Sequence, residues 1–269
     1  MPVRVEKDGP VTTVIINRPD ARNAVDPKTA DELVGAFKDF DSDQTASVAV
    51  FFGEHGYFCA GWDLKHASTG KGDLEFNELA MPTDDTEPPR GPLGPSRLEL
   101  TKPVIAAVAG PALAGGMELA LWCDIRVMEE DSYFGVYCRR WGIPLMDGGT
   151  VRLPRLVGQG KALEIIMTGR KVPAAECYEI GLCEKLVPRG RAREEAEKLA
   201  HEIARFPQEC MRADRRSVYL QHGLPVRDAL RGEWYNAVEA LKNEGIAGAG
   251  HFVSGLGRHG DFSKIQNED

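Results

Sequence analysis

The amino-acid sequence predicts an α/β fold that ends in a helical region. Two continuous apolar runs, SVAVFF at 47–52 and KPVIAAV at 102–108, have the pattern of strands that are buried on both faces, and a glycine-containing loop follows each. From residue 124 onward, strand and helix patterns alternate. The last third of the chain has apolar residues at helical spacing, which predicts helices of ordinary length.

The first half of the chain begins with an expected antiparallel pair of strands at 3–6 and 11–17, joined by a turn that contains Gly9 and Pro10. A helix is predicted at 27–40, because Asp26 can cap it and Pro27 suits a first helical position. The segment 69–95 predicts no packed element, since it holds eight prolines and glycines after residue 71. Loops of this length set substrate selectivity or are mobile, and both interpretations stay open.

The second half is expected to form one further strand and then helices. The predicted strand covers 124–128, and the predicted helices cover 151–156, 161–168, 174–180, 191–205, 208–222 and 225–243. We therefore divide the chain into a core at 1–190 and a helical C-terminal region at 191–269.

Composition excludes several classes of protein. The chain has 269 residues, of which 42% are hydrophobic and 28% charged, so a folded domain is expected. Its net charge of −8 argues against nucleic acid or an anionic membrane as a partner. The sequence shows neither a membrane-spanning run nor a signal peptide, so we expect a cytoplasmic protein. Six cysteines without a C-x-x-C pair predict reduced thiols and no metal site.

The familiar motifs for phosphate-binding loops, serine hydrolases, zinc proteases and dinucleotide binding are missing from the sequence. Two segments instead lead from a buried strand through a glycine-rich turn to a helix start, at 51–64 and 108–120. The first N–H groups of a helix are unpaired and lie at its positive end. Two such turns that face each other would form an oxyanion hole, and Glu118 would lie one turn into the second helix.

The sequence resembles the crotonase superfamily, the enoyl-CoA hydratase/isomerase family, in an ordered series of motifs. The motifs are NRP at 17–19 with NA at 23–24, FCAGWDL at 58–64, AGPALAGGMELA at 109–120, Asp124, FG at 134–135, GIP at 142–144, GGT at 148–150, LP at 153–154, TGR at 168–170 and AAE at 174–176. Each motif is weak alone, but the ordered series covers about residues 1–190 and is specific.

The resemblance implies a spiral of repeated ββα units, a helical C-terminal region that makes contacts in a homotrimer or a dimer of trimers, and an acyl-CoA thioester as substrate. Coenzyme A is part of that substrate, so no separate cofactor is implied. By motif position, Ala60 and Gly115 would supply the two oxyanion N–H groups. The residues that would lie along coenzyme A are Arg22, Ala24, Val25, Ala60, Gly61, Trp62, Asp63, Gly115 and Cys138.

The sequence departs from the family pattern at one acid. Hydratases of this family use two acids, and Glu118 matches the first, whereas Cys138 stands at the second. A thiol is a poorer proton shuttle near neutral pH than a carboxyl group. Asp147 resembles, by position, an acid of the dienoyl-CoA isomerases. We expect a hydratase first, an isomerase that uses Glu118 and Asp147 second, and a non-catalytic acyl-CoA binder third.

Structural interpretations of the same residues also stay open. Glu118 could have no role beyond a favourable interaction with the helix dipole. Asp147 could cap the helix after Gly149, and Cys138 could be a small buried side chain. Asp63 is expected to cap a helix that begins at Leu64. Trp62 is expected either to pack against its neighbours, which we favour, or to form a lid over the thioester, and His55 is expected to be a solvated loop residue.

Overall fold

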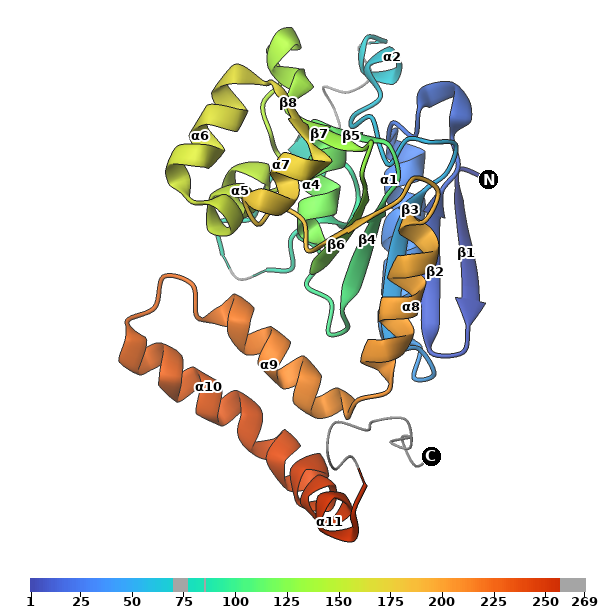
Figure 1. The fold of residues 1–269 in the computed structure, drawn as a ribbon. Helices are drawn as coiled ribbons and strands as arrows, with labels where there is room; N and C mark the ends of the chain where they lie inside the picture. Colours follow the sequence, from blue (N-terminus) through green and yellow to red (C-terminus); the bar gives the residue numbers. More distant parts are fainter. Residues whose placement is uncertain (70–76, 85, 257–269) are drawn as a thin grey trace.

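The computed structural model describes residues 1–69, 77–84 and 86–256. Its largest feature is a six-stranded sheet in the order β1-β2-β3-β4-β6-β9 (Figure 1). The strands are β1 (Val3–Asp8), β2 (Val11–Ile16), β3 (Val48–Gly53), β4 (Val104–Val108), β6 (Ile125–Glu129) and β9 (Lys185–Val187). β1 and β2 are antiparallel, as predicted, and every later pairing in this sheet is parallel.

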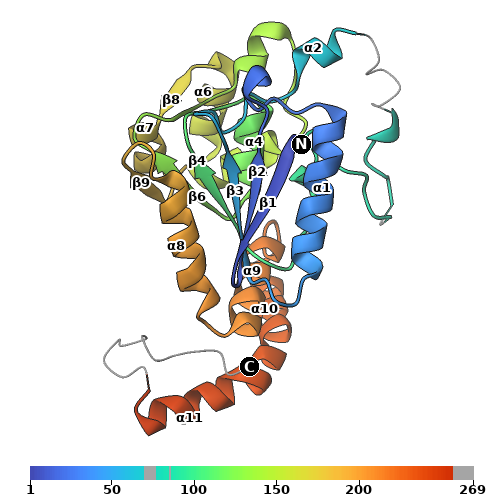
Figure 2. The same ribbon diagram turned by 90° about the vertical axis from the view of Figure 1, so that its right-hand side faces the viewer.

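Helices cover both faces of this sheet, with α1 (Pro27–Ser42) on one side and α8 (Ala192–Ala204) on the other (Figure 2). α1 packs the apolar side chains of Leu33, Phe37 and Phe40 into the larger core. α8 presents alanines at every fourth position, so the helix backbone can approach the sheet closely. Burial on both faces explains why β3 and β4 read as continuous apolar runs.

A second sheet of three short strands lies beside the first, in the order β5 (Pro111–Leu113), β7 (Tyr133–Gly135) and β8 (Lys171–Pro173). The chain passes from β4 to β5 and then to α4 (Gly115–Trp122), and it repeats the double strand with β6 and β7. These are the expected ββα turns, so the predicted α/β spiral is confirmed. The turn between β5 and α4 lies at the edge where the site forms.

The remaining helices of the core are α2 (Leu64–Ala67), α5 (Gly149–Val157), α6 (Gln159–Thr168) and α7 (Ala174–Glu179). Beyond α8, the chain forms α9 (Gln208–Leu220), α10 (Val226–Ala240), a π-helical turn (Leu241–Gly245) and α11 (Ile246–Ser254), which project away from the sheets (Figure 1). α9 is anchored to the core by Arg215, whose guanidinium donates to Asp124 Oδ1 and to the carbonyl of Leu100, both at 2.7 Å.

Several elements differ from the prediction. The helix expected to end at residue 243 continues through the π-helical turn to Ser254, so that boundary was wrong. The strands β5, β7, β8 and β9 were not predicted, because three residues are too few to establish a pattern. Part of the irregular segment 69–95, and residues 257–269, lie outside the described residues. In the part of the chain that is described, no helix has the length and apolarity needed to cross a bilayer.

Candidate active site

A cavity of about 500 Å³ opens where the two glycine-rich turns meet α4 and the 3-10 helix Tyr137–Trp141. Six of the residues singled out from the sequence line it: Ala60, Trp62, Gly115, Glu118, Cys138 and Asp147. The rest of the wall is largely apolar and includes Leu79, Leu93, Trp141, Ile143 and Met146. A cavity of this size and character is typical of a small-molecule site.

The structure brings the two glycine-rich turns side by side. Leu113 N–H donates to the Cys59 carbonyl at 2.9 Å. Gly61 has a φ of +89°, and a Cβ built on it would lie 3.1 Å from Gly115 N and 2.8 Å from the Leu113 carbonyl oxygen. A larger residue at position 61 would therefore be strained by its backbone and would also press on the start of α4.

The two expected oxyanion donors are not equivalent. Gly115 is the first residue of α4, and no acceptor within residues 1–69, 77–84 and 86–256 takes its N–H. Ala114 before it has φ 52° and ψ −118°, a strained conformation for a residue with a side chain. Ala60 N–H, in contrast, donates to the carbonyl oxygen of Arg22 at 3.1 Å. The site thus offers one open donor and one that already donates to a main-chain carbonyl.

Glu118 is buried, and its carboxyl group is held by main-chain donors. Its Oε1 accepts hydrogen bonds from the N–H of Asp147 at 2.9 Å and of Gly149 at 2.8 Å. Burial raises the pKa of Glu118 to about 7, and the nearby charge of Asp147 adds to the shift. A carboxyl group with this pKa can both take up and release a proton near neutral pH.

Asp147 is equally buried, and its Oδ1 accepts hydrogen bonds from Leu93 N–H at 3.0 Å and from the Ser96 hydroxyl. Burial raises its pKa, while the bonds from Ser96 and Leu93 oppose the rise. Gly148, not Asp147, precedes the first residue of α5, and no side chain caps that helix. The interpretation of Asp147 as a helix cap was therefore wrong.

Cys138 lies in the 3-10 helix and is buried at the cavity wall. Burial raises the pKa of its thiol, and the charge of Glu118 raises it further. The thiol is therefore protonated at neutral pH and cannot replace a carboxylate as a base.

The other residues expected along coenzyme A lie beside this cavity rather than in its wall. Arg22, Ala24, Val25, Gly61 and Asp63 are absent from its lining. Main-chain hydrogen bonds link their two segments, from Val25 N–H to the Gly61 carbonyl at 2.8 Å and from Asp63 N–H to the Val25 carbonyl at 3.0 Å.

Three structural interpretations have a clear outcome. Asp63 caps α2, because its carboxylate accepts from the N–H groups of Lys65 and His66, so that prediction is confirmed. His55 is exposed in its loop and bonds to Asn17, as expected of a solvated histidine. Trp62 packs against the core and also lines the cavity.

Sequence reasoning missed the residues that hold Asp147. Leu93 and Ser96 come from the irregular segment and its continuation, where no local pattern marks them. Arg152 on α5 donates to the carbonyls of Asp147 at 3.0 Å and Ser96 at 2.8 Å, and so joins the two loops. The contacts of Asp147 with Leu93 and Ser96, and of Arg152 with Ser96, each join residues more than 50 positions apart in the sequence. Only the contact between Arg152 and Asp147 is local.

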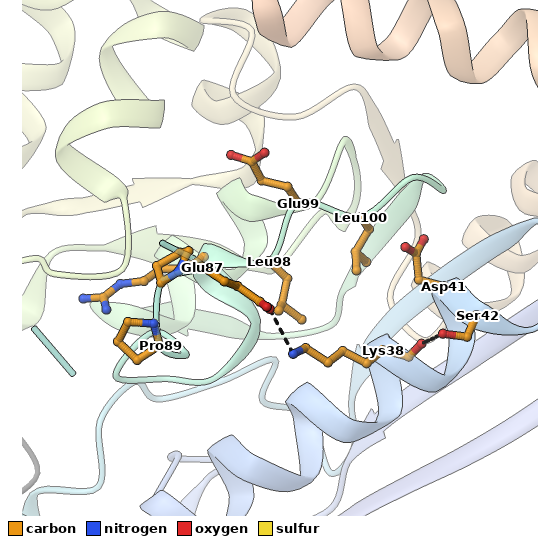
Figure 3. A pocket seen from close by; sticks show the side chains of 10 residues that line it. Lys38, Asp41, Ser42, Glu87, Pro89, Leu98, Glu99 and Leu100 are labelled. Carbon is orange, nitrogen blue, oxygen red and sulfur yellow. Dashed lines mark hydrogen bonds and ion pairs between the residues drawn. The ribbon is translucent and has the colours of Figure 1, made fainter. Parts of the chain in front are cut away.

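A second hollow of about 470 Å³ lies between α1 and the segment 87–100 (Figure 3). Its lining is mixed in charge, with the cations Lys38 and Arg97 and the acids Asp41, Glu87 and Glu99, and Lys38 pairs with Glu87 at 3.3 Å. The hollow holds neither the glycine-rich turns nor the two buried acids, so we place the chemistry in the first cavity.

The fold and the first cavity together define a class of protein: a spiral of ββα turns in which helix-start N–H groups and buried carboxyl groups meet in one apolar cavity. A model of the family described as enoyl-CoA hydratase/isomerase matches residues 6–230, and the chain belongs to this family. The resemblance seen in the sequence motifs is thereby confirmed.

Individual proteins that resemble this chain support the family assignment. An enoyl-CoA hydratase of Mycobacterium tuberculosis is 36% identical over 234 residues, which cover 84% of each chain. A carnitinyl-CoA dehydratase of Salmonella typhi is 35% identical over 204 residues, which cover 75% of this chain and 74% of that one. A crystal structure of an enoyl-CoA hydratase from M. tuberculosis matches with a TM-score of 0.84 at 33% identity, over 94% of this chain and 96% of that chain.

Proposed function

We propose that this protein is an enoyl-CoA hydratase that adds water across the double bond of a 2-enoyl-CoA thioester. The observation that carries the proposal is the meeting of the buried Glu118 carboxyl group and the open Gly115 N–H in one cavity. The names of the relatives support the same activity.

The geometry suggests how the reaction proceeds. The thioester oxygen accepts a hydrogen bond from Gly115 N–H, and Ala60 N–H turns partly from the Arg22 carbonyl to become the second donor. Negative charge develops on that oxygen only as the enolate forms, so both donors favour the transition state. One such donor is typically worth about 3 to 4 kcal/mol.

Glu118 in its ionised form takes a proton from water as the water oxygen bonds to the β-carbon. The electron pair of the double bond moves to the thioester oxygen, and the enolate then collapses as the α-carbon takes up a proton. In our proposal Asp147, the second carboxyl group in the cavity, passes to the α-carbon the proton that Glu118 has taken from water, so both groups return to their starting state. The Cys138 thiol holds its proton too tightly to exchange it quickly.

A second candidate is an isomerase that moves the double bond along the acyl chain. The observation that favours it is the pair of buried acids, Glu118 and Asp147, in a cavity where the family's usual second acid is replaced by Cys138. Such a pair could remove a proton at one carbon and return it at another without water. Turnover in water enriched in oxygen-18 separates the candidates, because only the hydratase places the label in the product.

The direct test is a spectrophotometric assay in which the purified protein is mixed with crotonyl-CoA and with longer 2-enoyl-CoA substrates. The loss of the conjugated thioester absorbance measures turnover. We expect turnover by the wild type and its loss in Glu118→Gln. The matched control is Glu129→Gln, because Glu129 is also a buried glutamate with a raised pKa but lies outside the cavity. Equal inactivity of the wild type and Glu118→Gln over the whole panel would exclude the hydratase.

We also propose that the chain self-associates through its C-terminal helices, as the family resemblance implies. Large apolar side chains are exposed there, among them Leu230, Trp234, Tyr235, Ile246 and Phe252. Contiguous exposed apolar surface marks an interaction site in a folded protein. Sedimentation equilibrium tests this proposal, and a monomer at micromolar concentration would contradict it.

A further inference from the structure

Each of the two buried acids has one oxygen that is occupied by two donors. Oε1 of Glu118 accepts hydrogen bonds from the N–H groups of Asp147 and Gly149. Oδ1 of Asp147 accepts from Leu93 N–H at 3.0 Å and from the Ser96 hydroxyl. Among the described residues, no donor bonds to Oδ2 of Asp147, and Oδ2 is not closed off inside the protein. Oδ2 is therefore the oxygen that Asp147 presents to the cavity that it lines.

The bonds to Oδ1 determine which oxygen of Asp147 can carry a proton. In a protonated carboxyl group, one oxygen bears the hydrogen and donates, whereas the other accepts. A main-chain N–H can only donate, so the oxygen that bonds to Leu93 N–H remains an acceptor. The Ser96 hydroxyl adds a second donor to the same oxygen. The proton of Asp147 therefore belongs on Oδ2, at the edge of the cavity.

Ser96 is buried, with 2% of its surface exposed, and it does not line the cavity. In the part of the chain that the structure describes, the bond to Asp147 is the only hydrogen bond of the Ser96 hydroxyl. A hydroxyl bond to a carboxylate is charge-assisted and stronger than a bond between neutral groups. Any effect of this hydroxyl on the reaction must therefore pass through Asp147.

The turn 91–94 leads directly to Ser96 and leaves room for its contact with Asp147. Gly91 and Gly94 exchange two main-chain hydrogen bonds of 2.9 Å. A Cβ on Gly91 would lie 1.9 Å from Ser96 Oγ and 2.7 Å from Asp147 Oδ1, so a side chain there would break the pair. On the other side, the Arg152 guanidinium donates to the main-chain carbonyls of Ser96 at 2.8 Å and Asp147 at 3.0 Å. The two partners are thus held together through their backbones as well.

Ionisable groups face Asp147 from three further places. Arg97 follows Ser96 in the 3-10 helix Pro95–Arg97, Arg152 belongs to α5, and Glu118 belongs to α4. The Cys59 thiol also lies near, and burial raises its pKa to about 12, so it stays uncharged.

These groups act on Asp147 in opposite directions. Burial raises the pKa of Asp147, whereas the bonds from Ser96 and Leu93 and the charges of Arg97 and Arg152 oppose the rise. Ser96 is thus one of several groups that favour the ionised form of this acid.

We propose that Ser96 is a positioning residue of the reaction, whose hydroxyl occupies Oδ1 of Asp147 and so keeps the transferable proton on Oδ2, the oxygen that faces the substrate. The inference rests on the proposed function and deepens it, because it states how the second acid is directed. The Oδ2–H bond breaks as the bond from hydrogen to the α-carbon forms, and Ser96 neither gains nor loses a proton. Without the hydroxyl, the carboxyl group of Asp147 is free to rotate away from the α-carbon.

Steady-state kinetics with crotonyl-CoA test the role of Ser96. We expect Ser96→Ala to lower kcat about tenfold or more, the effect of one hydrogen bond to a charged group. KM should change less than about threefold, because Ser96 does not line the cavity. The matched control is Ser132→Ala, since Ser132 is also buried, lies outside the cavity lining and donates its hydroxyl hydrogen to the Val108 carbonyl. We expect kcat of the control to stay within about threefold of the wild type.

A double variant shows whether Ser96 acts through Asp147. In the Asp147→Asn background, Ser96→Ala should lower kcat by less than about twofold, because the group that Ser96 directs is already gone. A further tenfold loss in that background overturns the inference. So does a kcat of Ser96→Ala that stays within about threefold of the wild type, or an equal loss in Ser132→Ala.

If the wild type turns over no 2-enoyl-CoA substrate, the proposed function fails, and a titration without substrate then decides about Ser96. NMR spectra of protein with carbon-13 in the aspartate carboxyl groups give the pKa of Asp147, and Asp147→Asn assigns its signal. A hydrogen bond to the ionised carboxylate lowers its pKa, so we expect a higher pKa in Ser96→Ala than in the wild type. That result supports the hold of Ser96 on Asp147 without any reaction, and equal pKa values overturn it.

Discussion

The main-chain N–H of Asp147 donates a 2.9 Å hydrogen bond to Oε1 of Glu118. This bond joins the first turn of α4 to the loop that precedes α5, so the position of one acid is set by the backbone of the other. Gly149 adds a second N–H to the same oxygen at 2.8 Å. The direction of the Glu118 carboxyl group therefore depends on the exact path of the loop 145–149.

Gly149→Ala should disturb Glu118 directly. A Cβ at position 149 would lie 2.9 Å from both Cγ and Oε1 of Glu118, so the carboxyl group must move. We expect kcat to fall about 100-fold or more, as when a general acid–base group is misplaced. Gly160→Ala on α6 is the control, since a Cβ there meets nothing within 4 Å. Steady-state kinetics of the two variants, with thermal unfolding to confirm folding, check this prediction. Unaltered kcat in Gly149→Ala would contradict it.

The raised pKa of Glu118 predicts a pH dependence of activity. If the ionised carboxylate is the base, kcat/KM should rise as pH increases through about 7. A pH profile of hydration from pH 5.5 to 9 measures this. A profile that is already level at pH 5.5 would show that another group, or none, limits the reaction.

The raised pKa of Glu118 also predicts that the free energy of unfolding falls as pH rises, whereas kcat/KM increases. The folded state keeps the proton of Glu118 up to about pH 7, whereas the unfolded state releases it near 4.5. The folded state thus binds more protons between these values, so the free energy of unfolding should fall as pH rises from 4.5 to 7. The loss is about 3 kcal/mol, and Glu118→Gln should lack it. Urea unfolding of both proteins across this range is the measurement.

Replacement of Asp147 should lower kcat far more than replacement of Cys138. Asp147→Asn removes the second acid of the cavity, and we expect a loss of about 100- to 10,000-fold in kcat. Cys138→Ser preserves the size of a side chain whose thiol stays protonated, and we expect a change of less than about threefold in kcat, in line with an ordinary substitution outside proton transfer. The reverse order of effects would assign the second acid role to Cys138.

The cavity predicts a preference for long or bulky acyl groups. Its volume of about 500 Å³ far exceeds a four-carbon acyl group, and its wall includes Leu79, Leu93, Trp141, Ile143 and Met146. Each buried methylene is worth about 0.8 kcal/mol, so KM should fall up to about fourfold per added carbon. A series of straight-chain 2-enoyl-CoA substrates from four to twelve carbons tests this, and a KM that does not change with length would contradict it.

Local chemistry in the sequence predicted a large part of the fold and of the site. The cap at Asp26, the proline at 27 and the apolar spacing located α1, and the glycine-rich turn at 108–120 located the start of α4 at Gly115. Glu118 was placed by its spacing from that helix start. The sequence motifs and the structure agree on these points because short-range rules determine them.

Contacts between distant segments could not be predicted. Ser96 and Leu93 reach Asp147 across more than 50 residues, and no periodic pattern marks either one. The engagement of Ala60 N–H by Arg22 depends on two left-handed residues at 22 and 23, which a motif does not reveal. The helix beyond residue 243 was missed because the glycines of 245–250 disfavour a helix by local propensity.

The most direct test of this account is a crystal structure with a bound acyl-CoA analogue that carries an enolate-like oxygen. We predict that this oxygen lies about 3 Å from Gly115 N and from Ala60 N, with the Glu118 carboxyl group beside the α- and β-carbons. A thioester oxygen bound away from Gly115, or a ligand that leaves Glu118 out of reach of both carbons, would contradict the account.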